Sequence, residues 1–265
     1  MTKKAIGVFD SGLGGLTILN ALRRTLPHEN LIYFGDTANV PYGSKSKEAV
    51  TRLSLAIGRF LQEQNVKLIV VACNTASAQA LDELKKKLAV PVMGVIEPGA
   101  TKAVSVTKNG HIAVLGTEGT VNSKAYPKAL LKKLPNARII QQACPLFVPL
   151  VEENWTNKPA AELIAHEYLL PIQQSRADTV ILGCTHYPVL KGVLSRILGE
   201  QVKLVDAADT LAEAAQVFLR KHHLAQTTGK GRITVYASDA PQRFKRLAQI
   251  LLADKISTVH LKKLL

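Results

Sequence analysis

Lys67-Leu-Ile-Val-Val-Ala-Cys73-Asn74-Thr75-Ala-Ser77, in the first half of the chain, has a counterpart in the second half, Asp178-Thr-Val-Ile-Leu-Gly-Cys184-Thr185-His186-Tyr-Pro188. In each stretch a short apolar, β-branched run of strand length ends at a cysteine. Small polar residues and a helical pattern follow, which predicts that both thiols lie at strand-to-helix turns. Such turns bind ligands in α/β proteins, and the amides at a helix N-terminus stabilise a thiolate. Two such thiols suit a reaction that needs a proton acceptor and a proton donor on opposite sides of a carbon.

The rest of the chain repeats this alternation of strand and helix. Apolar runs at 5–9, 30–34, 68–72 and 90–96 are separated by helical patterns, and this predicts a mainly parallel sheet covered on both faces. The pattern then restarts, since Ile112 repeats Ile6 after 106 residues and Cys184 repeats Cys73 after 111 residues. Similar offsets in the same order indicate an internal duplication.

We therefore expect two similar α/β domains with mainly parallel sheets, related by a pseudo-twofold, with the active site in the cleft between them. A helix from 210 and a closing strand at 233–238, followed by one more helix, are expected to return to the first domain. The first domain then comprises residues 1–97 and 207–265, and the second comprises residues 98–206. Pro98-Gly99 and the stretch 206–209 are the expected hinges.

Composition describes an ordinary globular protein. The chain has 265 residues, of which 47% are hydrophobic, and its apolar runs are about as long as strands. A membrane span needs roughly 20 apolar residues, and no signal peptide precedes the first strand, so we expect a cytoplasmic protein without a membrane partner. Three cysteines make a poor disulfide framework, and reduced thiols fit that compartment.

The formal net charge is +14, and residues 220–265 carry +8 of it, from ten Lys or Arg and two Asp. Attraction to nucleic acid is one interpretation of this surplus. Against it, Arg243, Lys245 and Arg246 alternate with Phe244 and Leu247 at helical spacing, and no recognised nucleic-acid motif accompanies them. A solvated basic helix face is the favoured interpretation.

Asp10 and Ser11 end the first apolar run, directly before the glycine-rich turn Gly12-Leu-Gly-Gly15. A nucleotide P-loop would also need a Lys and a Ser or Thr here, and the dinucleotide glycine spacing is absent, so a phosphate loop is not favoured. We expect the glycines to let a small ligand approach the backbone near Asp10 and Ser11. The alternative is that Asp10 is a plain helix cap.

Each candidate residue also has a structural interpretation. A free cysteine is frequently a core residue, and we interpret Cys144 in this way because no strand-end pattern surrounds it. Cys73 and Cys184 differ from it because polar residues follow both. His186 has no second ligand cluster with metal spacing, so tuning the proton affinity of Cys184 is the favoured role. Glu152 follows an apolar segment and is equally well a helix carboxylate.

Five motifs together resemble those of the glutamate racemases, in the aspartate/glutamate racemase superfamily. They are Asp10-Ser-Gly, Gly35-Asp-Thr, Pro41-Tyr42-Gly43, Cys73-Asn-Thr-Ala-Ser77 and Gly183-Cys-Thr-His-Tyr-Pro188. The resemblance covers residues 6–209, and the closing strand and helix fit the family's layout. Asn39 is a small departure, because the family more often has arginine or histidine there.

The resemblance implies cofactor-independent interconversion of L- and D-glutamate, which supplies D-glutamate for bacterial peptidoglycan. Carried onto this chain, it makes Cys73 and Cys184 the two acid/base residues, one on each face of the α-carbon. It also implies that Asp10 assists Cys73, and that His186 and Glu152 assist Cys184. No cofactor and no metal are implied. The substrate-binding positions that match are Asp10, Ser11, Tyr42, Gly43, Asn74, Thr75, Thr185 and His186.

Other functions remain open at this stage. Aspartate racemase shares the fold and mechanism, although His186 and Ser77 favour the glutamate branch. A cysteine hydrolase would need one essential cysteine, whereas racemisation needs both. The resemblance further implies a homodimer, and some members are reported to act on DNA gyrase, so nucleic-acid or gyrase binding is a second interpretation of the basic tail. One subtype has an N-terminal extension and a peptidoglycan-precursor activator; since Ile6 begins the first strand, we expect no such activator.

Overall fold

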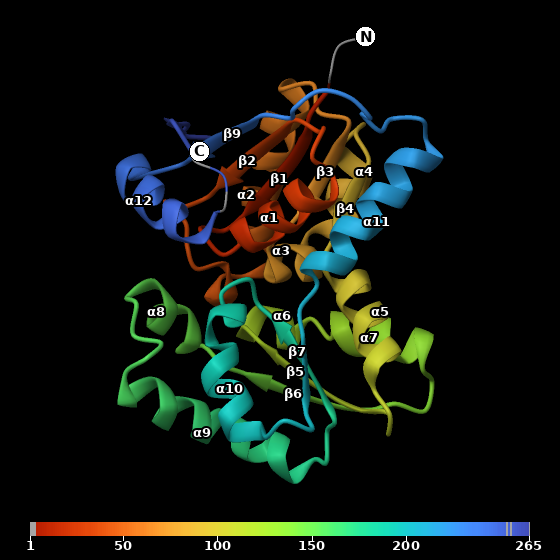
Figure 1. Cartoon of the computed structure of the whole chain (residues 1–265), viewed down its shortest axis with the longest axis vertical. Helices are drawn as coiled ribbons and strands as arrows, with labels where there is room; N and C mark the ends of the chain where they lie inside the picture. The colour runs from red at the N-terminus through yellow and green to blue at the C-terminus, as the bar shows by residue number, and fades with distance from the viewer. Residues whose placement is uncertain (1–3, 253, 255, 265) are drawn as a thin grey trace.

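The strands form two parallel sheets that lie in two separate lobes (Figure 1). The computed structural model describes residues 4–252, 254 and 256–264. The six-stranded sheet has the order β10-β9-β2-β1-β3-β4. Its strands are β1 (Ile6–Asp10), β2 (Leu31–Gly35), β3 (Leu68–Val71), β4 (Val92–Gly94), β9 (Ile233–Ala237) and β10 (Val259–Leu261). The four-stranded sheet has the order β6-β5-β7-β8. Its strands are β5 (His111–Gly116), β6 (Arg138–Ala143), β7 (Thr179–Gly183) and β8 (Lys203–Val205).

The second sheet repeats the connectivity of the first. In each, the first strand of the series lies centrally and pairs in parallel with the second and the third, so that Ile6 lies opposite Leu31 and Leu68. Ile112 lies opposite Ile139 and Thr179 in the same way. The order β2-β1-β3-β4 thus corresponds strand by strand to β6-β5-β7-β8. The expected α/β fold with two parallel sheets is confirmed, and the shared strand order is what a duplication produces.

Both faces of the six-stranded sheet are buried, which explains why its strands are apolar at consecutive positions. Ile6 and Val8 of β1 face one core, and Phe9 faces the other. The first core is covered by α1 (Leu16–Thr25), α11 (Ala208–Lys221) and α12 (Pro241–Leu251). The second is covered by α2 (Lys47–Glu63), α3 (Asn74–Gln79) and α4 (Leu81–Lys87).

The four-stranded sheet is covered in the same manner. Ile112 and Val114 of β5 face the core formed with α5 (Ile96–Val106) and α7 (Ala125–Lys133). Ala113 and Leu115 face the core formed with α8 (Phe147–Glu152), α9 (Pro159–Gln174) and α10 (Lys191–Leu198). Short helices at the ends of strands complete the lobes. They are α6 (Glu118–Asn122) and two 3₁₀ helices, η1 (Tyr42–Ser44) and η2 (Tyr187–Leu190).

Three expectations about the elements were wrong. The strand expected at 90–96 is only three residues long, and Pro98-Gly99, expected as a hinge, lies inside α5. Pro98 is compatible with this because a proline in the first turn of a helix removes an N–H that has no partner there. The chain also does not finish with a helix, because β10 follows α12 and pairs with β9.

The chain passes from the first sheet to the second between β4 and β5, and returns between β8 and β9. Boundaries at 97/98 and 206/207 stay a prediction about independent domains. None of the helices in the described part of the chain has the length and apolar character needed to cross a membrane.

Candidate active site

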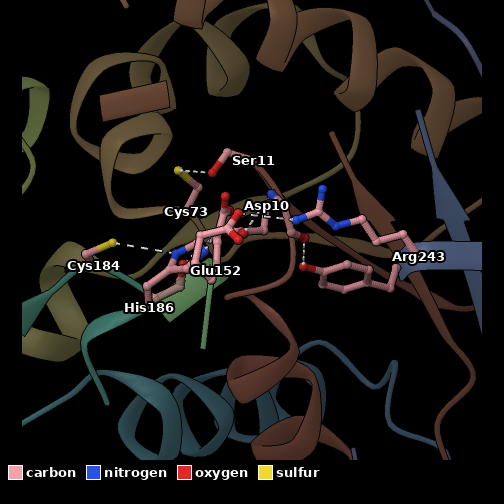
Figure 2. A network of polar contacts seen from close by, with 11 residues as sticks. Asp10, Ser11, Cys73, Glu152, Cys184, His186 and Arg243 are labelled. Carbon is pink, nitrogen blue, oxygen red and sulfur yellow. Dashed lines mark hydrogen bonds and ion pairs between the residues drawn. The ribbon is translucent and has the colours of Figure 1, made fainter. Parts of the chain in front are cut away.

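The carboxyl ends of the central strands of both sheets meet at the interface between the lobes. Asp10 ends β1, Cys73 follows β3, Thr117 follows β5 and Cys184 follows β7. Side-chain contacts join the lobes there: Thr185 Oγ1 donates to Asp10 Oδ1 (3.3 Å), and the Thr75 and Thr117 hydroxyls lie 2.8 Å apart. Parallel strands bring loops from distant parts of the sequence to one edge, which is where α/β proteins bind ligands. Figure 2 shows both cysteines beside the group formed by Asp10, Glu152 and His186.

Cys73 is the N-cap of α3, and its sulfur accepts a hydrogen bond from the Ala76 N–H at 3.5 Å. Its thiol points to the Ser11 hydroxyl, with 3.8 Å between Sγ and Oγ. Burial raises the pKa of Cys73 to about 12, the negative charge of Asp10 adds to this, and the Ala76 N–H opposes it. The Cys73 thiol therefore keeps its proton unless a further group stabilises the thiolate. The amide at the N-terminus of α3 offsets only part of the effect of burial.

Asp10 is fully buried beside the glycine turn. Its Oδ2 accepts from the Gly12 N–H at 3.0 Å, and the Tyr33 hydroxyl holds the same turn by donating to the Gly12 carbonyl at 2.8 Å. Burial raises the pKa of Asp10, while the charge of His186 and the turn's N–H groups act in the opposite direction. A carboxyl with a raised pKa beside a thiol is suited to exchanging a proton with it.

The glycine turn at 12–15 allows side chains of the other lobe to approach its backbone closely. A Cβ at Gly14 would lie 2.3 Å from Thr185 Oγ1 and 2.8 Å from His186 Nδ1, so only glycine lets these side chains approach. The sequence predicted a close approach by a ligand at this turn. The structure places the opposite lobe's side chains against Gly14.

Cys184 has a different set of partners. Its sulfur lies 3.9 Å from His186 Nδ1, and His186 Nε2 lies 3.3 Å from Glu152 Oε1 at the end of α8. Burial alone would lower the pKa of His186, but its contacts with Cys184 and Glu152, together with the charge of Asp10, outweigh burial and raise it to about 10. His186 is therefore an imidazolium at neutral pH, with one N–H facing the thiol and the other facing the carboxylate.

Tyr42 and Gly43 open η1, and the Tyr42 side chain is buried. The Tyr42 hydroxyl donates to Asp36 Oδ2 at 2.6 Å, and Asp36 also accepts from the Ser238 hydroxyl at 2.7 Å. Burial, followed by the charge of Asp36, raises the pKa of Tyr42, so the hydroxyl remains a donor. The backbone amides are what this segment can offer a ligand, because the first N–H groups of a helix lack intrahelical partners.

The structure thus brings all the candidate residues to one interface. Asp10, Ser11, Cys73, Asn74 and Thr75 come from the six-stranded lobe, as do Tyr42 and Gly43, while Glu152, Cys184, Thr185 and His186 come from the other. Asn74, Thr75 and Thr185 are buried, as the cysteines are. Thr117 and Thr120 were missed as contacts of Thr75, although the repeat of Ile6 at Ile112 places Thr117 in the position of Ser11 and was a signal that this strand end faces the site.

The outer side of the site is bordered by α12. Arg243, which Figure 2 labels, lies 3.7 Å from Glu153, the residue after Glu152, and so connects the two lobes. A cavity of about 160 Å³ opens beside this pair and is lined by Gly12, Glu152 and Phe244 among others. Within residues 4–252, 254 and 256–264, no group of three or more His, Cys, Asp or Glu side chains is arranged to hold a metal ion. The three cysteines are all free thiols.

Residues 15–215 match the family model described as Asp/Glu/Hydantoin racemase. The chain belongs to this family. A glutamate racemase of Geobacter metallireducens is 50% identical over 261 residues, which cover 98% of this chain and 97% of that protein. A glutamate racemase isoform of Bacillus anthracis has a solved structure that superposes with a TM-score of 0.96 at 35% identity, covering 100% of this chain and 99% of the other. The glutamate racemase of Francisella tularensis, solved in complex with D-glutamate, gives a TM-score of 0.93 at 36% identity, with coverage of 100% and 99%.

Proposed function

We propose that this chain interconverts L- and D-glutamate by proton transfer between the α-carbon and two thiols, Cys73 and Cys184. The observation that carries the proposal is the pair of cysteines that two different lobes bring to one interface, each with its own proton-exchanging neighbours. The racemase family and the names of the relatives supply the substrate, since both solved relatives described above are glutamate racemases.

In the proposed reaction, one cysteine reacts as a thiolate and removes the α-proton, forming its own S–H bond while the electron pair of the C–H bond moves toward the substrate carboxylate. The opposite thiol then gives its proton to the other face of the carbon and becomes the thiolate. Each cysteine is therefore a base in one direction and an acid in the other. The product leaves with inverted configuration, and atoms and charge balance without a further reactant.

The chief obstacle is that the free thiol of Cys73 is a weak acid. A bound amino acid brings an ammonium group, and a positive charge within a few ångströms lowers the pKa of a thiol. Asp10 on one side and the His186–Glu152 pair on the other are the groups proposed to take up or return the proton between turnovers. Hydroxyl and amide donors from Ser11, Asn74, Thr75 and Thr185, with the η1 amides, would bind the substrate carboxylates and stabilise the developing charge.

The proposed activity needs no cofactor. Pyridoxal phosphate is the usual electron sink for removing an amino-acid α-proton. A site that excludes water and presents two oriented thiols is an alternative to it, because charge stabilisation by fixed dipoles is stronger where water is absent. The proposed role in the cell is to supply D-glutamate for peptidoglycan, and expression in a bacterial strain that requires D-glutamate should remove this requirement.

The first test is α-proton exchange. Purified protein without added cofactor is incubated with L-glutamate, and separately with L-aspartate, in D2O, followed by NMR and chiral analysis. Loss of the glutamate α-proton signal with appearance of D-glutamate is expected. Exchange of aspartate alone would assign aspartate as the substrate, and exchange of neither by folded, reduced protein would refute the proposal.

We also propose a homodimer, on the family resemblance alone. Light scattering coupled to size-exclusion chromatography should give twice the 28.7 kDa mass of the chain. A mass of one chain across the micromolar range would contradict this.

A further inference from the structure

Tyr126 lies in α7, in the lobe that carries Cys184, yet its hydroxyl reaches the residue that follows Cys73. The Tyr126 hydroxyl donates to Asn74 Oδ1 at 2.7 Å. The Tyr126 side chain is completely buried, and Asn74 is the first residue of α3. This hydrogen bond therefore crosses between the lobes immediately beside the first cysteine.

The ring of the same tyrosine touches the backbone beside the second cysteine. A Cβ added to Gly183, which directly precedes Cys184, would lie 3.1 Å from Tyr126 Cε2. On another side, a Cβ added to Gly99 of α5 would lie 3.0 Å from the hydroxyl oxygen and 3.2 Å from Cε1. The ring is thus confined by two glycine backbones, and one side chain contacts the neighbours of both thiols.

The hydrogen bond fixes which end of the Asn74 carboxamide faces the site. Burial raises the pKa of Tyr126, and the nearby charges of Asp206 and Cys184 add to this, so the hydroxyl keeps its proton. A buried hydroxyl proton needs an acceptor, and the amide oxygen is the acceptor present. With the oxygen held by Tyr126, the NH2 group of Asn74 is the end left for a ligand.

We propose that Tyr126 is a positioning residue that holds the Asn74 carboxamide with its NH2 group toward the substrate. This inference rests on the proposed function, in which Asn74 binds glutamate. Without the hydroxyl, the carboxamide can rotate and present its oxygen, which repels a carboxylate instead of donating to it. Tyr126 thus acts through Asn74, the residue to which its hydroxyl donates.

Tyr126→Phe tests this directly, because it keeps the confined ring and removes only the hydroxyl. We expect the KM for glutamate to rise about tenfold, the size of one oriented hydrogen bond, with a smaller fall in kcat. The matched control is Tyr187→Phe, which removes another fully buried hydroxyl of the same lobe; that hydroxyl donates to the Cys144 carbonyl at 2.9 Å. The control should keep the wild-type KM.

A second variant disturbs the same hydrogen bond while keeping both its donor and its acceptor. Gly99→Ala places a methyl group against the hydroxyl at 3.0 Å, in a helix where alanine is otherwise favoured. We expect the KM to rise with Gly99→Ala also, while thermal unfolding shows a folded protein. This variant keeps the inference testable if Tyr126→Phe proves unstable.

A double-mutant cycle separates positioning from a general structural role. In an Asn74→Ala background, Tyr126→Phe should change the KM less than twofold, because the group it orients has gone. Equal effects of Tyr126→Phe with and without Asn74, or a wild-type KM for Tyr126→Phe, would overturn the inference.

Binding of D-glutamate, measured by calorimetry, distinguishes the two possible failures. If the wild type racemises glutamate and Tyr126→Phe binds it with unchanged affinity, only the role of Tyr126 is wrong. If the wild type neither binds nor racemises glutamate, the proposed function fails and this inference fails with it.

Discussion

Cys73 and Cys184 have unequal polar neighbours. Cys73 has a hydroxyl, a helix amide and a buried carboxyl near it, whereas Cys184 faces an imidazolium backed by Glu152. The groups that can exchange a proton with each thiol therefore differ: Asp10 lies on the Cys73 side, and the His186–Glu152 pair lies on the Cys184 side.

Replacing either cysteine should abolish racemisation while leaving the fold intact. General acid–base groups contribute roughly 10²–10⁴-fold to rates, so Cys73→Ala and Cys184→Ala should each lose at least 10²-fold in a chiral assay. Cys144→Ala is the control, since Cys144 is buried among apolar residues of α8 and α9 and should retain activity within about twofold. Dependence on only one of Cys73 and Cys184 would point to a single nucleophile, as in a hydrolase.

The raised pKa of His186 predicts a pH-dependent contribution to stability. Because the folded-state value of about 10 exceeds the ordinary 6.5, the folded protein holds this proton more tightly than the unfolded chain does. The contribution is complete below pH 6.5 and is lost as pH rises through about 10. The difference in unfolding free energy between wild type and His186→Gln should therefore shrink from pH 6 to pH 10 in urea titrations. A difference that stays constant would mean that His186 is not charged in the fold.

The sequence indicated most single residues of the site but not their contacts. Asp10, Cys73 and Cys184 were found because a polar residue at the end of a buried strand is conspicuous. Tyr126 could not be found, since an aromatic residue in an amphipathic helix is usually a core residue, and Asn74 lies 52 residues away. Nor could sequence spacing show that the Tyr42 hydroxyl donates to Asp36.

Among the elements, the end of β2 connects η1 with the segment that follows β9. Asp36 follows this strand and is almost completely buried. It accepts from the Tyr42 hydroxyl of η1, from the Asn39 amide at 3.0 Å and from the Ser238 hydroxyl after β9. The carboxylate therefore links η1, whose amides are proposed to bind substrate, to the end of β9.

Removing this carboxylate should weaken both the fold and substrate binding. Asp36→Ala leaves the Tyr42 and Ser238 hydroxyls buried without their acceptor, and each orphaned group costs about 1–3 kcal/mol. We expect a comparable loss of unfolding free energy in urea and a raised KM for glutamate. Asn39→Ala is the control, because it removes a partly exposed donor to the same carboxylate and should cost less. Equal losses for the two variants would show that the buried hydroxyls find other acceptors.

The boundaries of an element could be predicted where apolar and polar residues alternate over several periods. They could not be predicted where the apolar run is short or fits both a strand and a helix. The helical pattern of α2 (Lys47–Glu63) can be recognised in the sequence, because seventeen residues hold several helical periods. The strand predicted at 90–96 was too long, because it included Ile96, which is the first residue of α5. An isoleucine is common both in strands and on the buried face of a helix, so its type did not mark the boundary. β10 has three residues and lies at the sheet edge, too short for an alternating pattern to appear.

At the scale of the whole molecule, a buried ion pair lies at the end of the six-stranded sheet opposite the site. It holds the segment by which the chain returns from α11 to β9. Lys67, directly before β3, lies 2.6 Å from Glu29 Oε2, and both side chains are at most 5% exposed. Lys67 also donates to the Leu224 carbonyl at 2.6 Å, while the Gln226 N–H donates to Glu29 Oε1 at 2.8 Å. The segment after α11 is thus held by both charges before β9 enters the sheet.

Because neither charge reaches water, loss of one partner should be costly. Lys67→Met leaves the Glu29 carboxylate buried without a counter-charge, which is expected to lower the unfolding free energy by about 3–5 kcal/mol. Replacing both residues, Lys67→Met with Glu29→Leu, should recover part of that loss, since it removes the uncompensated charge. Lys86→Met is the control: its pair with Glu83 is exposed to solvent, so no measurable change is expected.

Activity separates this role from that of the site. The ion pair lies at the amino ends of the strands and the thiols lie at the carboxyl ends, so folded Lys67→Met protein should keep the wild-type kcat and KM below its unfolding temperature. A large fall in kcat without unfolding would mean that the return of the chain sets the relation between the lobes. Cys73 and Cys184 follow strands of opposite lobes, so the distance between their thiols depends on how the lobes are positioned. In that case the Lys67–Glu29 ion pair would help to set that distance, although it lies far from the site.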